Sequence, residues 1–232
     1  MMDEIRRDVS WLITLLKSRR GAVVISGGNG TGKTILSLQT VEEIMRDGRF
    51  CIYVLTTMSP QSLVETGSSI SLDLSEPIES GKMVIVDCYS RFTGATSLAK
   101  YVLGPEASLL QLRETILTSA MGSGGYHLVI DDLSTLLAYT ASETAFKFYQ
   151  AIVSDIRRNS ASATAILVPD ILETKLTNLL YSLSDGVVDM SLEEMGGALR
   201  RFIRIRFLRG VHHPTEWFEY VIGPRGIELI SE

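Results

Sequence analysis

An eight-residue stretch near the N-terminus carries the most specific chemistry of this sequence. It reads Gly27-Gly28-Asn29-Gly30-Thr31-Gly32-Lys33-Thr34 and fits the pattern G-x-x-x-x-G-K-[ST]. Its glycines allow successive backbone N–H groups to turn inward around a phosphate without clashes of Cβ atoms. Lys33 would neutralise the β- and γ-phosphate oxygens, and the Thr34 hydroxyl would bind Mg²⁺. The stretch therefore predicts a phosphate-binding loop for a nucleoside triphosphate, with ATP and Mg²⁺ as the expected cofactors.

The sequence on either side of this loop predicts the setting that the motif requires. Ala22 to Ser26 is an apolar, β-branched run typical of a strand, and apolar residues recur at helical spacing from Lys33 to about Met45. A helix that begins at Lys33 points the positive end of its dipole at the phosphates. A glycine-rich turn with an incidental lysine is the alternative, and it does not require this order of strand, loop and helix.

A second oxygen ligand for Mg²⁺ is expected at the end of another apolar strand of the same sheet. Asp131 follows Leu128-Val129-Ile130, and Asp87 follows Val84-Ile85-Val86. Either aspartate could instead cap the turn after its strand. We favour Asp131 as the metal ligand that acts with Thr34.

The remaining elements predict an α/β fold in a single domain over residues 1–232. An N-terminal helix is expected in residues 1–20, where Ile5, Val9, Leu12 and Leu16 recur at helical spacing. Short apolar runs alternate with helical stretches as far as residue 185, which indicates a mainly parallel sheet with helices on both faces. After Asp185 short strands follow one another, with turn signals at Gly196-Gly197 and Pro224-Arg225-Gly226. We expect these strands to form an antiparallel extension of the same sheet.

Composition and charge limit the classes of partner. The chain is 45% hydrophobic and 21% charged, and no segment approaches the length of an apolar membrane span. Its N-terminus lacks the apolar core of a signal peptide, so a cytoplasmic location is expected. The net charge of −5 argues against nucleic acid binding by the whole surface, but several arginines crowd into residues 200–209.

Beyond the loop, several stretches resemble the RecA-like ATPases, and in particular their KaiC-like branch, which includes the circadian-clock ATPase and archaeal single-domain relatives. The likeness covers nearly the whole chain after Gly21. Besides the loop it rests on Asp131-Asp132-Leu133-Ser134, Asp87-Cys88-Tyr89-Ser90, Ser184-Asp185-Gly186-Val187-Val188, Arg209-Gly210-Val211-His212-His213 and Gly226-Ile227-Glu228-Leu229.

The resemblance implies a homo-oligomer or a partner protein that completes the site. The family's tail usually reads Lys-x-Arg-Gly-x-x-His, and its Lys and Arg reach the nucleotide of a neighbouring subunit. Arg209 matches that arginine and His213 the histidine, whereas Phe207 stands where the lysine is expected. Arg209 and His213 are therefore candidate nucleotide contacts, with a turn or solvent role as the alternative.

Ile203, Ile205 and Phe207 alternate with the two-residue period of a strand. We therefore expect these three side chains to face the core, and Arg204 and Arg206 between them to face solvent.

The main departure from the family concerns catalysis. Where the family carries the glutamates that activate water, this chain has Thr57 and Met58. Neither side chain can accept a proton from water at neutral pH, so slow ATP hydrolysis is expected. Asp132 is a candidate substitute, although its neighbour Asp131 should point to the opposite face of a strand.

Three functions fit these residues. The first is a nucleotide-dependent regulatory or assembly module with slow hydrolysis. The second is an active ATPase of the motor or clock type. The third is a recombinase-like accessory protein that binds single-stranded DNA through Arg200, Arg201, Arg204 and Arg206.

Overall fold

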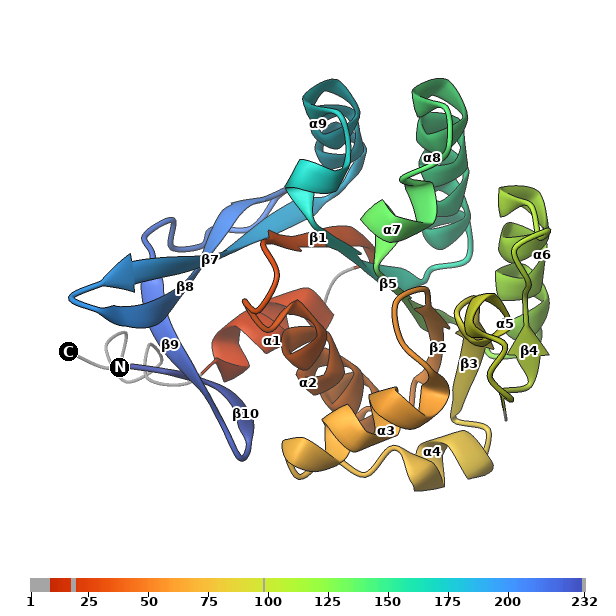
Figure 1. The fold of residues 1–232 in the computed structure, drawn as a ribbon, viewed down its shortest axis with the longest axis horizontal. Coiled ribbons are helices and arrows are strands. Elements are labelled where there is room, and N and C mark those ends of the chain that lie inside the picture. Colours follow the sequence, from red (N-terminus) through yellow and green to blue (C-terminus); the bar gives the residue numbers. More distant parts are fainter. Residues whose placement is uncertain (1–8, 18–19, 98, 231–232) are drawn as a thin grey trace.

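The computed structural model describes residues 9–17, 20–97 and 99–230. They form one ten-stranded sheet (Figure 1), with the order β10-β9-β8-β7-β1-β6-β5-β2-β3-β4. Its strands are β1 (Gly21–Gly27), β2 (Phe50–Leu55), β3 (Met83–Asp87), β4 (Tyr101–Val102), β5 (Tyr126–Asp131), β6 (Ser162–Leu167), β7 (Gly186–Met195), β8 (Ala198–Leu208), β9 (Phe218–Gly223) and β10 (Gly226–Leu229). The helices are α1 (Ser10–Lys17), α2 (Lys33–Arg46), α3 (Pro60–Ser69), α4 (Ser75–Glu79), α5 (Ser90–Thr93), α6 (Leu109–Ser119), α7 (Leu133–Leu137), α8 (Ser142–Arg158), the 3₁₀ helix η2 (Pro169–Ile171) and α9 (Thr174–Leu183).

The sheet is parallel from β7 to β4 and antiparallel from β7 to β10. This confirms the predicted α/β fold, with a mainly parallel sheet and a C-terminal antiparallel extension. One detail differs from the expectation. Strand β7 pairs in parallel with β1, so the antiparallel part begins at β8.

Helices cover both faces of the parallel strands (Figure 1). Ala22 and Val24 of β1 are buried in the core formed with α6, α7, α8 and α9. Val23 and Ile25 of the same strand are buried on the other face, together with residues of α1 and α2. A strand buried on both sides reads as a continuous apolar run, which is why β1 was recognisable in the sequence.

The carboxyl ends of the parallel strands meet at one edge of the sheet. In the register of the strands, Leu55 at the end of β2 lies opposite both Asp131 of β5 and Asp87 of β3. The loop that follows β1 leaves from the same edge, because β1 runs parallel to β6 and β6 to β5. Ligands of such sheets bind outside these ends of the strands.

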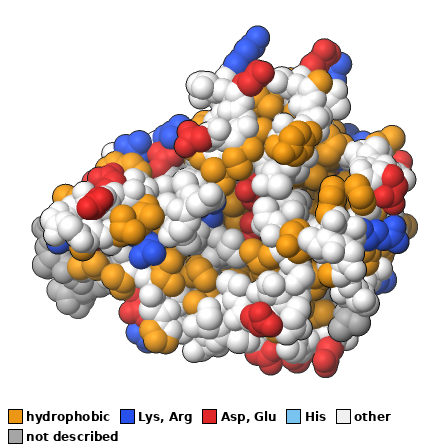
Figure 2. Space-filling model, viewed as in Figure 1, with side chains coloured by type: hydrophobic (Ala, Val, Ile, Leu, Met, Phe, Trp, Pro, Cys, Tyr) orange, Lys and Arg blue, Asp and Glu red, His pale blue; other side chains and the backbone are white. Residues whose placement is uncertain are grey.

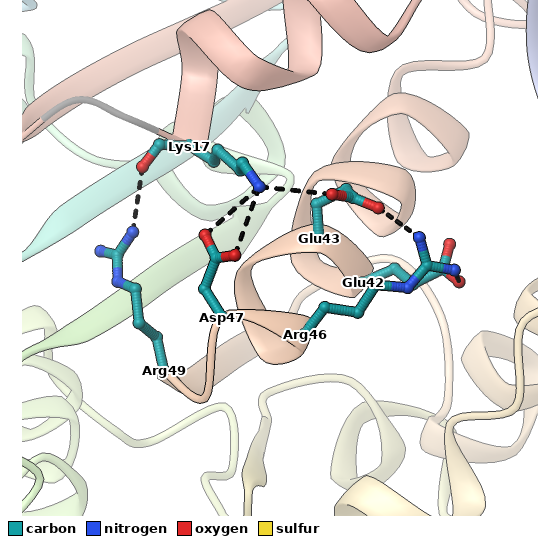
Figure 3. A network of polar contacts seen from close by, with 6 residues as sticks. All are labelled: Lys17, Glu42, Glu43, Arg46, Asp47 and Arg49. Carbon is teal, nitrogen blue, oxygen red and sulfur yellow. Dashed lines mark hydrogen bonds and ion pairs between the residues drawn. The ribbon is translucent and has the colours of Figure 1, made fainter.

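Helix α1 is fixed to α2 by apolar packing and by charges, and the charged contacts are shown in Figure 3. Leu12 and Leu16 are buried, as their helical spacing predicted, whereas Ile5 lies outside the described residues. The Lys17 ammonium lies 3.3 Å from carboxylate oxygens of both Glu43 and Asp47. None of the described helices is both long and apolar enough to cross a membrane.

Candidate functional site

The glycine-rich loop between β1 and α2 is stabilised by its own side chains. Gly30 and Gly32 adopt φ angles of +79° and +86°, which favour glycine. The buried Thr31 hydroxyl donates to the carbonyl oxygen of Gly28 at 2.9 Å, and the Lys33 ammonium donates to the same oxygen at 2.7 Å. The cationic head of Lys33 therefore lies against the loop.

The backbone donors of this loop are available for a ligand. Within the described part of the chain, the N–H groups of Thr31 and Gly32 find no hydrogen-bond acceptor. They lie directly before the N-terminus of α2, where the helix dipole adds positive potential. This combination of open N–H groups and a helix N-terminus is typical of a phosphate-binding site.

Asp131 lies beside the first residues of α2. The Thr34 hydroxyl donates to its Oδ2 atom at 2.9 Å, and the buried Tyr53 hydroxyl donates to the same oxygen at 3.0 Å. Burial raises the pKa of Asp131 to about 6, although both hydrogen bonds oppose that shift. A hydroxyl and a carboxylate oxygen therefore meet at this point, and these are the hard oxygen ligands that Mg²⁺ prefers.

The charge of Lys33 is balanced by two neighbouring acids, Asp131 and Asp132. Its side chain is largely buried, and this burial lowers the pKa of Lys33. The nearby carboxylates of Asp132 and Asp131 oppose that shift. The site thus combines one buried cation with two buried acids, whose balance an incoming phosphate would change.

Asp87 has a different environment from Asp131. Its Oδ1 atom accepts the N–H groups of Tyr89 at 2.8 Å and Ser90 at 2.9 Å. It also lies two strands away from Asp131 in the order β5-β2-β3, or roughly 10 Å at the usual strand spacing. This geometry fits the alternative of a strand-end cap.

The residues at the ends of β2 and β5 differ in their contacts. Asp132 caps α7, because its Oδ1 atom accepts the N–H of Thr135 at 2.6 Å. Thr56 joins the two strand ends, since its hydroxyl donates to the carbonyl of Asp132 at 2.9 Å. Thr57 is exposed, and Met58 packs against the core around α2, β2 and β3. The backbone N–H of Thr56 also donates to the Asp131 carbonyl at 2.9 Å, so Thr56 contacts the backbone of both aspartates.

Arg209 and His213 make local contacts within the chain. The Arg209 guanidinium donates to the carbonyl of Ser182 at 2.7 Å, and Nδ1 of His213 lies 2.9 Å from the carbonyl oxygen of Val211. The backbone N–H of Arg209 bonds to Asp185, which in turn bonds to Ala22 at the amino end of β1. Both contacts place Arg209 at the edge of the sheet opposite the loop.

The arginines of β8 do not form one basic surface. Arg204 and Arg206 both ion-pair with the buried carboxylate of Asp189, at 3.0 and 2.8 Å, and each stacks on an aromatic ring. Arg200 pairs with Glu219. The sequence had suggested that Arg204 and Arg206 simply face solvent. Figure 2 shows, on the face in view, Lys and Arg side chains scattered among Asp and Glu.

A register shift in β8 explains the fate of Phe207, which we had expected to share a face with Ile203 and Ile205. The pairing with β7 slips between Val187 and Val188. Phe207 consequently packs in the core of α6–α9, whereas Ile203 and Ile205 lie in the core of α1 and α2. Two-residue periodicity fails at such a bulge.

Several residues of the site were missed in the sequence. Tyr53 binds Asp131 from the middle of β2, and nothing distinguishes it from an ordinary core tyrosine. Arg201 donates from β8 to the Gly30 carbonyl at 3.1 Å, and the hydroxyl of Tyr220 in β9 donates to the Thr31 carbonyl. These two contacts join segments far apart in the chain, so local patterns carry no signal for them.

Comparison with known proteins agrees with this geometry. The sequence model of the KaiC ATPase family matches residues 17–232. A UPF0273 protein of Aeropyrum pernix is 24% identical over 98% of this chain and 93% of its own length, and one of Thermotoga maritima is 25% identical over 90% and 87%. A crystal structure of a KaiC-like protein from Pyrococcus horikoshii has the same fold, with a TM-score of 0.72 at 19% identity, over 91% of this chain and 89% of that one.

Proposed function

Because the chain belongs to the KaiC family of RecA-like P-loop ATPases, we propose that it binds ATP with Mg²⁺ and hydrolyses it slowly, as a nucleotide-dependent regulatory or assembly module. The observation that carries this proposal is the 2.9 Å contact between the Thr34 hydroxyl and Asp131. It joins the end of the loop to the end of β5. A metal ion bound there would lie beside the terminal phosphates of a nucleotide in the loop.

Each residue of the site has a role in this proposal. The loop from Gly28 to Gly32 surrounds the β-phosphate with N–H groups, and Lys33 neutralises the β- and γ-phosphate oxygens. Thr34 and Asp131 supply oxygen ligands to Mg²⁺. Held by these two oxygens, Mg²⁺ would neutralise charge on the terminal phosphates. Tyr53 orients Asp131 through its hydrogen bond.

Slow turnover is expected from the side chains that lie near the site. Water-orienting or general-base groups typically contribute on the order of 10²–10⁴-fold to rate. Thr57 is exposed and cannot accept a proton at neutral pH, and Met58 is apolar and packed in a core. Asp132 is the remaining acid near Lys33, but one of its oxygens caps α7. A protein that binds ATP tightly and hydrolyses it slowly can change its contacts with partners according to the nucleotide that it holds.

The first test concerns binding. We expect Lys33→Ala to weaken ATP affinity by about 100-fold or more in calorimetry, because a buried phosphate would lose its cation. Asp131→Ala should reduce the Mg²⁺-dependent part of the affinity more than Asp87→Ala does. Lys147→Ala is the matched control, since Lys147 is exposed and pairs with Glu143 one turn away on α8. Unchanged affinity in Lys33→Ala would contradict the assignment of the loop.

The second test concerns turnover. We expect hydrolysis below about 0.01 s⁻¹, a rate comparable to unassisted P-loop switches. Thr57→Glu or Met58→Glu should raise that rate without strengthening ATP binding, because each places a carboxylate at the end of β2. Turnover of about 1 s⁻¹ in the unmodified protein would contradict the proposal and favour an active ATPase, with Asp132 as the base.

A further inference from the structure

Two side chains of the antiparallel extension hold consecutive carbonyl groups of the glycine-rich loop. The Arg201 Nε atom donates to Gly30 at 3.1 Å, and the Tyr220 hydroxyl donates to Thr31. Arg201 and Tyr220 lie directly opposite each other on β8 and β9. This cross-strand pair therefore fixes the peptide groups directly before and after Thr31.

Apolar packing brings the loop close to the same strands. A Cβ atom added to Gly32 would lie 2.7 Å from the Cδ1 atom of Ile222, and one added to Gly30 would lie 3.7 Å from Leu192. Positive φ angles at both glycines strain any other residue there. The loop thus rests on β7 and β9, in addition to its two hydrogen bonds.

Peptide geometry links these contacts to phosphate binding. In a planar trans peptide the C=O and N–H groups point in opposite directions. A carbonyl of Gly30 held by Arg201 therefore directs the N–H of Thr31 away from β8. In the same way, the bond from Tyr220 to the Thr31 carbonyl directs the N–H of Gly32 away from β9. These are two of the open N–H groups that face a ligand.

We propose that Arg201 and Tyr220 are positioning residues for the phosphate-binding loop. The pair turns the N–H groups of Thr31 and Gly32 toward the β-phosphate, and so sets the affinity for nucleoside di- and triphosphates alike. This inference rests on the proposed function for the identity of its ligand. It assigns a role in the site to the antiparallel extension, which the loop motif itself does not include.

The position of Tyr220 makes the pair rigid. Tyr220 is almost fully buried, and burial raises the pKa of its hydroxyl, so the hydroxyl keeps its proton as a donor. Beyond the end of β9, the side chain of Gln39 in α2 accepts the N–H of Ile227 at 3.0 Å and donates to Arg225 at 3.1 Å. These two hydrogen bonds fix the β9–β10 hairpin to α2, the helix that begins directly after the loop.

The experiment compares Arg201→Ala, Arg201→Lys and Tyr220→Phe with the control Arg200→Ala. Arg200 is the neighbouring residue on β8 and ion-pairs with Glu219, away from the loop. We expect Arg201→Ala and Tyr220→Phe each to weaken ATP and ADP binding roughly tenfold, the scale of one lost hydrogen bond to a constrained group. Arg201→Lys should restore most of the affinity, because it retains a donor.

A second measurement separates positioning from loss of fold, and from failure of the proposed function. Amide NMR shifts of residues 30–32, recorded without nucleotide, should move in Arg201→Ala and Tyr220→Phe and stay in place in Arg200→Ala, with thermal unfolding cooperative in all. Unchanged loop shifts would overturn the inference whether or not the protein binds ATP. Equal loss of affinity in Arg200→Ala would overturn it as well. Absence of ATP binding by the unmodified protein, with these shifts moving, would overturn only the proposed function.

Discussion

At the scale of single residues, Asp131 is an acid whose environment opposes its charge. It is buried at the end of β5, and among the residues that the structure describes, Thr34 and Tyr53 alone donate hydrogen bonds to its side chain. Its raised pKa of about 6 means that the folded protein holds this proton where the unfolded chain, with the usual value of 3.8, has lost it. A bound cation would remove this conflict, because it favours the carboxylate form.

The sign of this shift gives a pH prediction. The folded state binds the extra proton between about pH 4 and 6, so stability falls as the pH rises through that window and the loss is complete above it. Asp131→Asn should therefore gain about 1–3 kcal/mol relative to the unmodified protein at pH 7.5 compared with pH 4. Denaturant titrations at the two pH values measure this difference.

The control for the pH prediction is Asp73→Asn, since Asp73 is exposed and accepts the N–H of Ser75 at the start of α4. A pH dependence of the same size in both variants would show that the effect is not specific to Asp131. The affinity for ATP with Mg²⁺ should also fall below about pH 6, where Asp131 takes up its proton. A flat affinity from pH 5 to 8 would argue against Asp131 as the metal ligand.

At the scale of elements, the side chain of Gln39 attaches the β9–β10 hairpin to α2. We expect Gln39→Leu to destabilise the protein by about 1–3 kcal/mol, because the buried N–H of Ile227 loses its acceptor. Denaturant unfolding measures the change. Gln61→Leu is the control, since Gln61 is exposed on α3 and bonds only to Glu65. Equal effects of the two substitutions would mean that the attachment contributes nothing.

Elements with a long regular pattern could be predicted from the sequence. β1 and α2 are found almost at the predicted bounds, because a buried strand leaves a continuous apolar run and an amphipathic helix a regular periodicity. The short helices α3, α7 and α9 were not recognised. Helix α3 begins at a Ser59 cap followed by Pro60, a signal that lies inside the stretch compared with the family's catalytic glutamates. The bulge in β8 could not be predicted, since it depends on pairing with β7.

The residues of the candidate site also differ in whether the sequence could identify them. Lys33, Thr34 and Asp131 could be proposed from the sequence because a motif or a strand end marks them, and the structure places them close together. Arg201 and Tyr220 lie 171 and 189 residues from their partners in the loop, so only the folded sheet brings them together. Contacts of this kind depend on topology, which a local pattern does not encode.

At the scale of the whole molecule, the two edges of the parallel sheet carry different parts of the predicted site. The loop leaves β1 at its carboxyl end, whereas Arg209 is connected through Asp185 to Ala22 at the amino end. The six residues from Ala22 to Gly27 span roughly 16 Å at the usual rise of a strand. An arginine side chain on this edge does not reach the loop of its own chain. Arg209 can therefore contact only a nucleotide that is bound to another copy of the chain.

This separation gives a prediction about assembly. If copies of the chain associate so that Arg209 meets a neighbour's nucleotide, Arg209→Ala should weaken ATP affinity roughly tenfold, the loss of one charge-assisted hydrogen bond, and only at concentrations where the protein is assembled. Light scattering with and without ATP and Mg²⁺ gives the mass, and calorimetry at matched concentrations gives the affinity. Arg225→Ala is the control, because the Arg225 side chain is exposed at the β9–β10 turn and pairs with Glu228. An equal loss of affinity in the monomer would contradict a contact in trans, since the fold keeps Arg209 away from its own loop.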